Sequence, residues 1–417
     1  MGKQVKVHRK RGKLRWGRIL AAALALLLVI VLILLGTRLF HKVGSGKSPE
    51  AGDLSTSTQE QSEVSKEEIK PPATVKFLSV GDNLIHSNLY QQAKQRAGGN
   101  GYDFSFAYEK MADLVSSADI ATINQETIID TEKEPSSYPQ FNSPKEVGDE
   151  LETLGFDVVN LANNHMIDMY ESGLRNAVAY WNAKAPKIVT TGAYLNEEKL
   201  NTVEYNECNG IKFGYVGATD YTNGLSLPQG SELRYILTSE TDLLKKKIEA
   251  AKAVCDVVIV NVHWGNEYSY EPTENQRKLA QQMVDWGADV IIGHHPHVLQ
   301  PMEYLTKPNG EKALVVYSLG NFISAQDAAP RVIGGMVQYE ITKNFETNTI
   351  SIDNVVFEPL ITHYGSRFSN IQVIPYSQYN DTLASQHGIR SETPGFSLEY
   401  IQNLVKDIIP VEFIKVF

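Results

Sequence analysis

Five apolar, strand-like runs in this chain of 417 residues each end in residue types that bind metals or transfer protons. In chain order, the residues at the ends of these runs are Gly81-Asp82, Asn124-Gln125-Glu126, Asn163-Asn164-His165, His263-Trp264-Gly265 and Gly293-His294-His295. Open α/β sheets present reactive side chains at the ends of buried strands. The repetition therefore favours an α/β fold in which several strand ends supply one site.

The most informative of these runs is Ala288–Val298, which places three histidines within four residues. Val290, Ile291 and Ile292 form the apolar part, and His294, His295 and His297 follow Gly293. Imidazole is the commonest protein ligand for transition metals. The spacing of His295 and His297 allows both rings to reach one metal site or two adjacent sites.

The distribution of charge argues against nucleic acid as a partner. Residues 1–18 hold eight Lys or Arg and no acid, so the remaining chain has 31 basic and 49 acidic residues, a net charge of -18. Nucleic-acid binding needs basic patches that neutralise phosphates. The two cysteines, Cys208 and Cys255, are too few for a disulfide framework or a Cys-rich zinc site. Whether they pair or stay free is open from the sequence.

The N-terminal region predicts a membrane anchor. Residues 1–18 form a basic arm, and residues 19–37 are uncharged and apolar, long enough to span ~30 Å of hydrocarbon as a helix. A cleaved signal peptide is disfavoured, because the apolar run is long and no small-x-small cleavage site follows it. Residues 38–73 are polar and predict a flexible linker. By the positive-inside rule, we expect a single-pass cell-membrane protein with a cytoplasmic N-terminus and an extracellular main domain.

Helix and strand signals alternate from residue 74 onward, and antiparallel strands dominate the last third. We expect a main domain over residues 74–375 and a C-terminal extension over residues 376–417. A capping box that begins at Ser143 predicts a helix that ends at Gly155. Further helices are predicted over Asp103–Ser117, Gly173–Lys184, Thr241–Ala253, Thr273–Trp286 and Ser397–Lys406, and late strands over Ala313–Tyr317, Gly335–Thr342, Thr349–Phe357 and Asn370–Pro375.

The residue types at the strand ends suit a centre with divalent metals. Carboxylate, amide and imidazole ligands together fit Mn, Fe or Zn, and the lack of thiolates disfavours a purely structural zinc. Two such ions ~3.5–4 Å apart can activate water and hold the oxygens of a hydrolysed ester or phosphate. Glu126 is our candidate for the bridging ligand. His165 is our candidate for a proton donor to the leaving group.

Taken together, the motifs resemble the CapA family of capsule and poly-γ-glutamate synthesis. The resemblance covers roughly residues 74–337 and rests on several motifs in the same order. They are Gly81-Asp82, Asn124-x-Glu126, Asn163-Asn164-His165-x-x-Asp168, His263-Trp264-Gly265, His295-Pro296-His297 and Ser318-Leu319-Gly320-Asn321-Phe322.

The resemblance implies a four-layer α/β/β/α sandwich of the calcineurin-like metallophosphoesterase type. It assigns Asp82 and His297 to one metal, and Asn164, His263 and His295 to the other. Glu126 would bridge the two ions, and His165 would donate the proton. The first motif departs from the phosphoesterase pattern, because it lacks Asp-x-His and because Glu126 replaces the bridging aspartate.

Other polar residues near these motifs have less specific interpretations. Asp168 is expected to orient His165 rather than to bind a metal. Asn321 fits a substrate-binding role and a turn role equally well. His294 is interpreted as structural, because the pair of His295 and His297 carries the resemblance. His86 fits a ligand or an ordinary surface residue.

The resulting hypothesis is a membrane-anchored protein that acts in synthesis, export or anchoring of an anionic polymer such as poly-γ-glutamate. The resemblance implies two divalent ions, metal-assisted hydrolysis or transfer, and membrane synthase subunits as partners. One alternative is a general extracytoplasmic metallophosphoesterase. The other is a non-catalytic assembly subunit of a polymer synthase complex.

Overall fold

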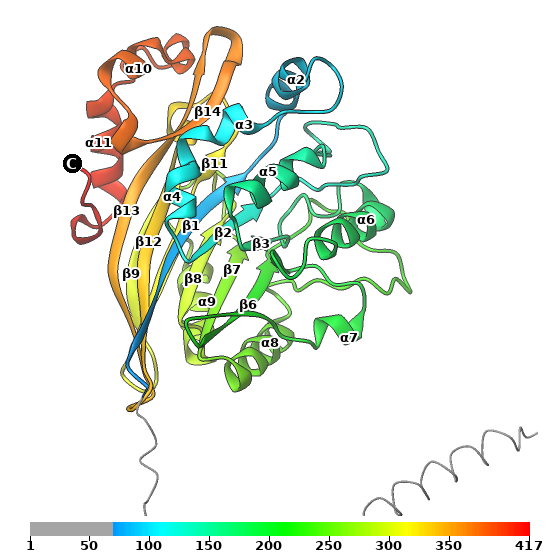
Figure 1. The fold of residues 1–417 in the computed structure, drawn as a ribbon, viewed down its shortest axis with the longest axis vertical. Coiled ribbons are helices and arrows are strands. Elements are labelled where there is room, and N and C mark those ends of the chain that lie inside the picture. Colours follow the sequence, from blue (N-terminus) through cyan, green and yellow to red (C-terminus); the bar gives the residue numbers. More distant parts are fainter. Residues whose placement is uncertain (1–69) are drawn as a thin grey trace, which may run out of the picture. The chain divides into compact units, whose positions relative to one another are not determined.

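The computed structural model describes residues 70–417, and its strands form two mixed sheets (Figure 1). The eight-stranded sheet has the order β14-β13-β12-β1-β2-β3-β4, with β11 paired to β1. Strands β1 to β4 are parallel, whereas β12, β13 and β14 continue the sheet in antiparallel pairs. The bounds are β1 (Ala73–Asn83), β2 (Ile120–Gln125), β3 (Val158–Asn160), β4 (Val189–Thr191), β11 (Asn321–Ile323), β12 (Ile333–Asn344), β13 (Thr349–Gly365) and β14 (Ser369–Pro375).

The second sheet has six strands in the order β5-β6-β7-β8-β10-β9. Its four central strands β6, β7, β8 and β10 are parallel, and β5 and β9 pair antiparallel at the edges. The bounds are β5 (Glu204–Cys208), β6 (Ile211–Thr219), β7 (Val257–His263), β8 (Val290–His294), β9 (Leu299–Thr306) and β10 (Lys312–Leu319).

The two sheets pack face to face, and helices cover their outer faces. Along β7, Val257 and Ile259 join the core shared by the sheets, whereas Val258 and Val260 join a second cluster beneath helices α8 (Thr241–Val254) and α9 (Glu274–Asp285). Alternate side chains of a strand point to opposite faces, so a strand buried on both faces reads as a continuous apolar run. Helices α5 (Glu146–Leu154) and α6 (Tyr170–Asn182) lie beside the first sheet (Figure 1). The layers thus run helix, sheet, sheet, helix.

An aspartate at the start of four parallel strands fixes the register of each with its neighbour. In every case the Asp Oδ2 accepts the backbone N–H of one residue in the adjacent strand at 2.7–2.9 Å. The Asp backbone N–H in turn donates to the backbone carbonyl of that partner residue. The pairs are Asp119 with Lys76, Asp157 with Ala121, Asp256 with Lys212, and Asp289 with Val258. The paired strands are therefore held in a fixed register from their amino ends. Their carboxyl ends consequently have a fixed arrangement.

The remaining helices are short and lie mostly near the first sheet. The segment after residue 375, expected as an extension, packs Ala384, Ile401 and Val405 into the main core. The bounds are α2 (Ser87–Arg96), α3 (Ser105–Tyr108), η1 (Glu109–Met111), α4 (Ala112–Ser116), α7 (Glu197–Leu200), η2 (Ala329–Val332), η3 (Ser366–Phe368), η4 (Tyr376–Gln378), α10 (Asp381–Gln386), η5 (Gly388–Ser391), α11 (Leu398–Ile408) and η6 (Val411–Phe413).

Several expected elements are confirmed, and the prediction that Ser143 caps a helix is wrong. Helix α9 carries a capping box from Thr273, and Gly155 ends α5 in a left-handed conformation with φ 97°. Ser143, however, does not cap α5, because its hydroxyl donates to Thr127 Oγ1 and the helix starts after Lys145 without a side-chain cap. The helix expected over Asp103–Ser117 is broken into α3, η1 and α4. Both cysteines are free thiols.

The predicted basic arm, apolar segment and most of the linker lie outside residues 70–417. None of the helices in the described part of the chain combines the length and apolar composition needed to cross a membrane. The expectation of an N-terminal anchor therefore stays a prediction.

Candidate metal centre

The predicted ligands lie together where the carboxyl ends of strands from both sheets meet. Asp82 lies at the end of β1, Glu126 follows β2, and Asn164 lies in the loop after β3. The second sheet supplies His263 from the end of β7, with His295 and His297 directly after β8. All six residues are buried. The apolar strand-like runs predicted this position, because parallel strands present their carboxyl ends at one edge of a sheet.

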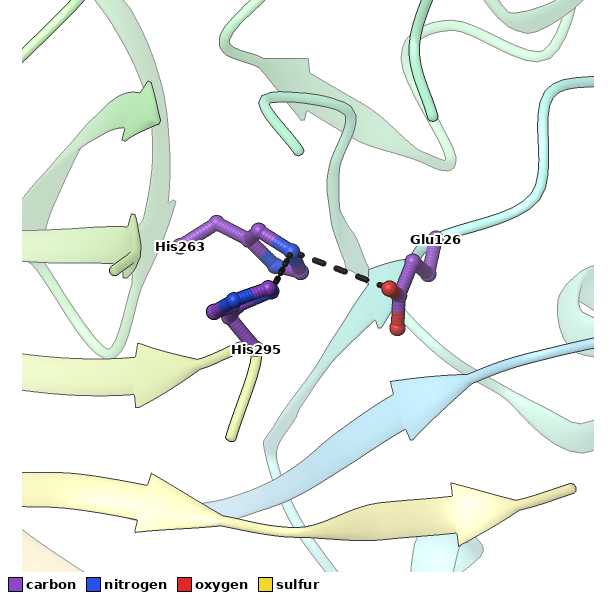
Figure 2. A group of neighbouring side chains, drawn as sticks. All are labelled: Glu126, His263 and His295. Carbon is purple, nitrogen blue, oxygen red and sulfur yellow. Dashed lines mark hydrogen bonds and ion pairs between the residues drawn. The ribbon is translucent and has the colours of Figure 1, made fainter. Parts of the chain in front are cut away.

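The first group of ligands surrounds the ring of His263. Its Nε2 lies 2.9 Å from Asn164 Oδ1, 3.1 Å from His295 Nδ1 and 3.7 Å from Glu126 Oε1. Figure 2 shows the His263 ring joined by dashed lines to His295 and to Glu126. Ligand atoms of Glu126, His263 and His295 all lie within 4.8 Å of one another, close enough to share one ion.

The second group consists of Asp82, Glu126 and His297. His297 Nδ1 lies 3.4 Å from Asp82 Oδ2, and its Nε2 lies 3.6 Å from Glu126 Oε1. Glu126 thus belongs to both groups, and its Oε1 is the atom that lies near His263 and near His297.

The protonation of these residues is strongly perturbed. Burial raises the pKa of Glu126 well above its usual value and lowers that of His263 well below it. Burial and the nearby His297 lower the pKa of His295 to about 3. For His297, burial would lower the pKa, but the Glu126 and Asp82 carboxylates raise it to about 9. Such opposed shifts are typical of functional sites.

The residues present fit a divalent cation. Both carboxylate oxygens of Glu126 are buried and have no hydrogen-bond partner within residues 70–417. A buried carboxylate without donors is unfavourable unless a cation compensates it. The neutral rings of His263 and His295 also present nitrogens to the same space. The donor set of carboxylate, amide oxygen and imidazole suits Mn, Fe or Zn.

The backbone around the histidine pair is strained. His295 has φ 97° and His297 has φ 57°, both in the left-handed region that non-glycine residues rarely adopt. Gly293 precedes them in β8, and a Cβ there would lie 1.9 Å from the Tyr317 carbonyl oxygen. Only glycine allows this close approach of the strands. The chain thus accepts local strain to direct both imidazoles toward Glu126.

The predicted proton donor is held beside the centre by its expected partner. His165 Nδ1 lies 2.7 Å from Asp168 Oδ2, and this oxygen also accepts the Phe141 backbone N–H at 2.7 Å. The Phe141 ring packs edge-on against His165. Because Asp168 engages Nδ1, the other ring nitrogen of His165 remains available for proton transfer.

Asn321 and His86 are engaged with protein groups. Asn321 Oδ1 lies 3.0 Å from His297 Nδ1, and its Nδ2 donates to Gln326 and to the Arg331 carbonyl. These contacts favour a role in orienting His297 over contact with substrate. His86 Nδ1 accepts the Ala325 backbone N–H, and His86 is absent from the candidate ligand groups found in residues 70–417.

His294 was predicted to have a structural role and not to be a ligand, yet it lies beside the candidate ligand Asp82. It is buried, and its Nδ1 lies 3.5 Å from Asp82 Oδ1. Neither ring nitrogen has a hydrogen-bond partner in the described part of the chain. It continues the inward-facing row of Val290 and Ile292 on β8, which places it between the sheets.

Three further residues lie around the centre, and none of them is among the ligands predicted from the sequence. Glu267 groups with His295 and His297 as a possible ligand from the loop after β7. The Tyr221 hydroxyl contacts His295 Nε2. Asn124 Nδ2 donates to Asp82 Oδ1 at 2.8 Å and lies 3.4 Å from His263 Nδ1. Glu267 lies only four residues after His263, and this short spacing after a strand end could have identified it.

Comparisons with known proteins agree with the motifs. The family model described as "Bacterial capsule synthesis protein PGA_cap" matches residues 76–326. A PGA biosynthesis protein CapA from Bacillus subtilis is 34% identical over 214 residues, 50% of this chain and 54% of that protein. A capsule biosynthesis protein CapA from Bacillus anthracis is 36% identical over 195 residues, 46% of this chain and 45% of that protein. The chain therefore spans about half the length of these relatives.

Solved structures show weaker similarity. A phosphatase from Mycoplasma pneumoniae aligns with a TM-score of 0.40 and 15% identity, covering 68% of this chain and 93% of that chain. A putative 5'-nucleotidase from Staphylococcus aureus aligns with a TM-score of 0.43 and 15% identity, covering 73% of this chain and 54% of that chain. At these TM-scores, neither similarity defines the type of sandwich.

Proposed function

Because the chain belongs to the bacterial capsule synthesis family PGA_cap, which confirms the resemblance in the motifs, we propose that it acts in capsule or poly-γ-glutamate synthesis as a metal-dependent hydrolase or transferase. The observation that carries the enzymatic part is Glu126, a buried carboxylate without hydrogen-bond partners in residues 70–417, placed between His263 and His297. The names of the two Bacillus relatives, both CapA proteins, support the biological context.

The proposal includes a two-ion centre in a sandwich of metallophosphoesterase type. Asp82, Glu126 and His297 would hold one ion, and Glu126, Asn164, His263 and His295 the other. Bound divalent ions supply Lewis acidity and a nucleophile at neutral pH. The proposal also includes a membrane anchor and an extracellular domain. Its substrate would be an anionic polymer, and its partners would be synthase subunits.

The chain's own residues would handle the protons of the reaction. His165 delivers a proton from its free ring nitrogen to the leaving group, and Asp168 keeps the ring oriented through Nδ1. Phe141 shields one side of His165 from water. Asn321 orients His297 so that its Nε2 faces Glu126.

Metal content of the purified full chain tests the proposal. After equilibration with Mn, Zn or Fe and removal of free ions, we expect about two ions per chain by elemental analysis. The matched control is His295→Ala with His297→Ala, which removes one ligand from each ion and should lower the content to below one. One ion in the parent would overturn the two-ion centre. No ion under any condition would contradict the enzyme and favour an assembly subunit.

A further inference from the structure

An arginine lies beside the candidate centre with a single aromatic ring between them. Arg331 lies in η2, and its guanidinium carbon is 3.6 Å from the centroid of the Tyr268 ring. The Tyr268 ring centroid lies 6.1 Å from that of His297. Tyr268 is 41% exposed, so this pair lies at the solvent-facing rim of the centre.

The scaffold of the centre holds both members of the pair. The Tyr268 backbone N–H donates to the Pro296 carbonyl at 2.8 Å, between the two candidate ligands of the histidine segment. The Arg331 carbonyl accepts from Asn321 Nδ2 at 2.9 Å, and Asn321 also contacts His297. Tyr268 has φ 66°, which is rare for a bulky residue. The stack is therefore preorganised by the same segments that position the histidines.

The guanidinium donors of Arg331 are free to bind an anion. Within residues 70–417, the Arg331 side chain forms neither an ion pair nor a hydrogen bond, whereas Arg175, Arg234 and Arg277 pair with glutamates. An arginine stacked on an aromatic face keeps its in-plane N–H groups available. Those groups match the oxygens of a carboxylate or phosphate in a bidentate arrangement.

Among residues 70–417, Arg331 is a cation without an ion pair beside a centre that contains buried carboxylates. In the described residues, no Lys or Arg forms an ion pair with the carboxylates of the centre. Two lysines of α8 are already engaged by protein groups. Lys247 is buried against Glu204 and two carbonyls, and Lys245 pairs with Glu249 along α8. A polyanion that approaches this acidic chain therefore meets a free, ordered cation at the rim.

We propose that Arg331, stacked on Tyr268, forms a subsite for a carboxylate of the substrate, next to the bond that reacts at the centre. This inference rests on the proposed function and deepens it. Every unit of a γ-linked glutamate polymer carries a free α-carboxylate on the carbon that bonds to its amide nitrogen. Binding of that carboxylate selects acidic polymers over neutral peptides and fixes the register of the chain.

Direct binding tests the subsite without any need for turnover. The probe is a short γ-linked glutamate oligomer, compared with the same oligomer carrying α-carboxamides, titrated against the full chain by calorimetry. We expect Arg331→Gln to weaken binding of the acidic oligomer about ten- to a hundredfold, the range for losing a charged hydrogen-bonded contact. Binding of the amidated oligomer should change less than about twofold. Arg331→Lys should restore part of the affinity, because it keeps the charge but loses the planar donors.

Two controls separate this effect from unfolding and from loss of metal. Arg367→Gln removes an exposed arginine that also lacks an ion pair in the described residues, and it should bind both oligomers as the parent does. Tyr268→Phe keeps the stacking ring and should retain binding, whereas Tyr268→Leu should weaken it. Thermal unfolding and metal content of each variant should match the parent.

The outcomes are distinct. Equal affinity of Arg331→Gln and the parent for the acidic oligomer would overturn the subsite, whatever the metal content. A parent that binds inorganic phosphate but not the oligomer, with phosphate binding lost in Arg331→Gln, would overturn the carboxylate assignment. Absence of metal from the parent, with Arg331-dependent oligomer binding intact, would instead contradict only the proposed chemistry.

Discussion

Glu126 is the residue on which both ion sites of the proposed centre depend, because its carboxylate lies between His263 and His297 and has no other partner in the described chain. Without a cation, its burial destabilises the folded state. With a cation, the same burial strengthens the electrostatic attraction. A single side chain therefore couples the stability of the protein to its metal content.

Substitution Glu126→Gln should change stability in opposite directions with and without metal. After chelation at pH 10, above the pKa of about 9 of His297, we expect the variant to be more stable than the parent by about 1–3 kcal/mol, because a neutral amide replaces a desolvated carboxylate that no longer has a protonated His297 beside it. In the presence of Mn or Zn, the variant should be less stable and hold fewer ions. Urea unfolding in both conditions measures this, with His363→Gln as a control far from the ligand groups. Equal metal content in variant and parent would contradict the bridging role.

The sequence predicted which candidate ligands the fold brings together, because each follows an apolar strand. Asp82, Glu126 and His263 could be placed by counting to the end of a run, without knowledge of the fold. The rim residues could not be placed in this way. Arg331 lies in a short 3-10 helix, and Tyr268 becomes relevant only because the loop folds onto Pro296. Loop conformation depends on long-range packing, which has no local periodic signal.

At the scale of elements, the aspartates that start the parallel strands differ in their electrostatic surroundings. Asp256 is paired with Lys343, and Asp289 with Lys252 and Lys307. Asp157 has no ion pair among residues 70–417, and burial together with Asp119 raises its pKa to about 6. The backbone N–H of Ala121 only partly offsets this rise. Register at β3 is therefore maintained at an electrostatic cost near neutral pH.

Asp157→Asn should stabilise the protein, with a defined dependence on pH. The carboxyl has a pKa of about 4 in the unfolded chain and about 6 in the folded chain, so the parent loses stability as pH rises through this window. In the variant, the side-chain amide oxygen can still accept the backbone N–H of Ala121. Because the amide does not ionise, the variant does not lose stability in this pH window. Its advantage should grow from about pH 4 to pH 6 and then remain constant at about 1–2 kcal/mol, discounted for partial exposure.

Asp256→Asn is the matched control, since hydrogen bonds from Lys212 and Lys343 outweigh burial and lower the pKa of Asp256. Asp256→Asn should be less stable than the parent at neutral pH, whereas Asp157→Asn should be more stable. Urea unfolding at several pH values measures both. A pH-independent difference for Asp157→Asn would show that its carboxyl is not perturbed in the folded state.

Helices α8 and α9 were predicted more accurately than the longest strand, β13, which was expected to end at Phe357 but continues to Gly365. Helices α8 and α9 lie within one residue of their expected bounds, because each combines a periodic apolar face with a clear start or stop. The error at Ser143 has a specific cause, since Thr127 competes for its hydroxyl across the loop. Strand β10 was expected among antiparallel strands; it pairs antiparallel to β9 on one side but parallel to β8 on the other. Pairing partners are set by the whole sheet and are not encoded in one strand.

For the whole molecule, metal binding should act as a link between the two sheets. The ligands Asp82, Glu126 and Asn164 come from one sheet, and the three histidines from the other. Ions that bind only the folded state add stability by mass action, about 2.7 kcal/mol at a hundred times the dissociation constant. We expect chelation to lower the Tm by several degrees, and restored Mn or Zn to reverse the change.

Hydrogen exchange would localise this effect. Chelation should increase exchange most at the carboxyl ends of β1, β2, β7 and β8, and least at the strand starts fixed by the aspartates. The variant His295→Ala with His297→Ala should show neither the Tm shift nor the change in exchange. A chelation response that persists in this variant would place the stabilising ion elsewhere.

The pairing of β1 with β12 also governs when the centre can form. The first strand of the described chain finds its antiparallel partner about 260 residues later, at Ile333–Asn344. Contacts so distant in sequence form late in folding. A ribosome or a secretion channel releases Asp82 and Glu126 long before His295 and His297, so a nascent chain has no complete ligand set to capture an ion. If the centre binds metal as proposed, the compartment in which the last strands emerge would determine which metal it acquires.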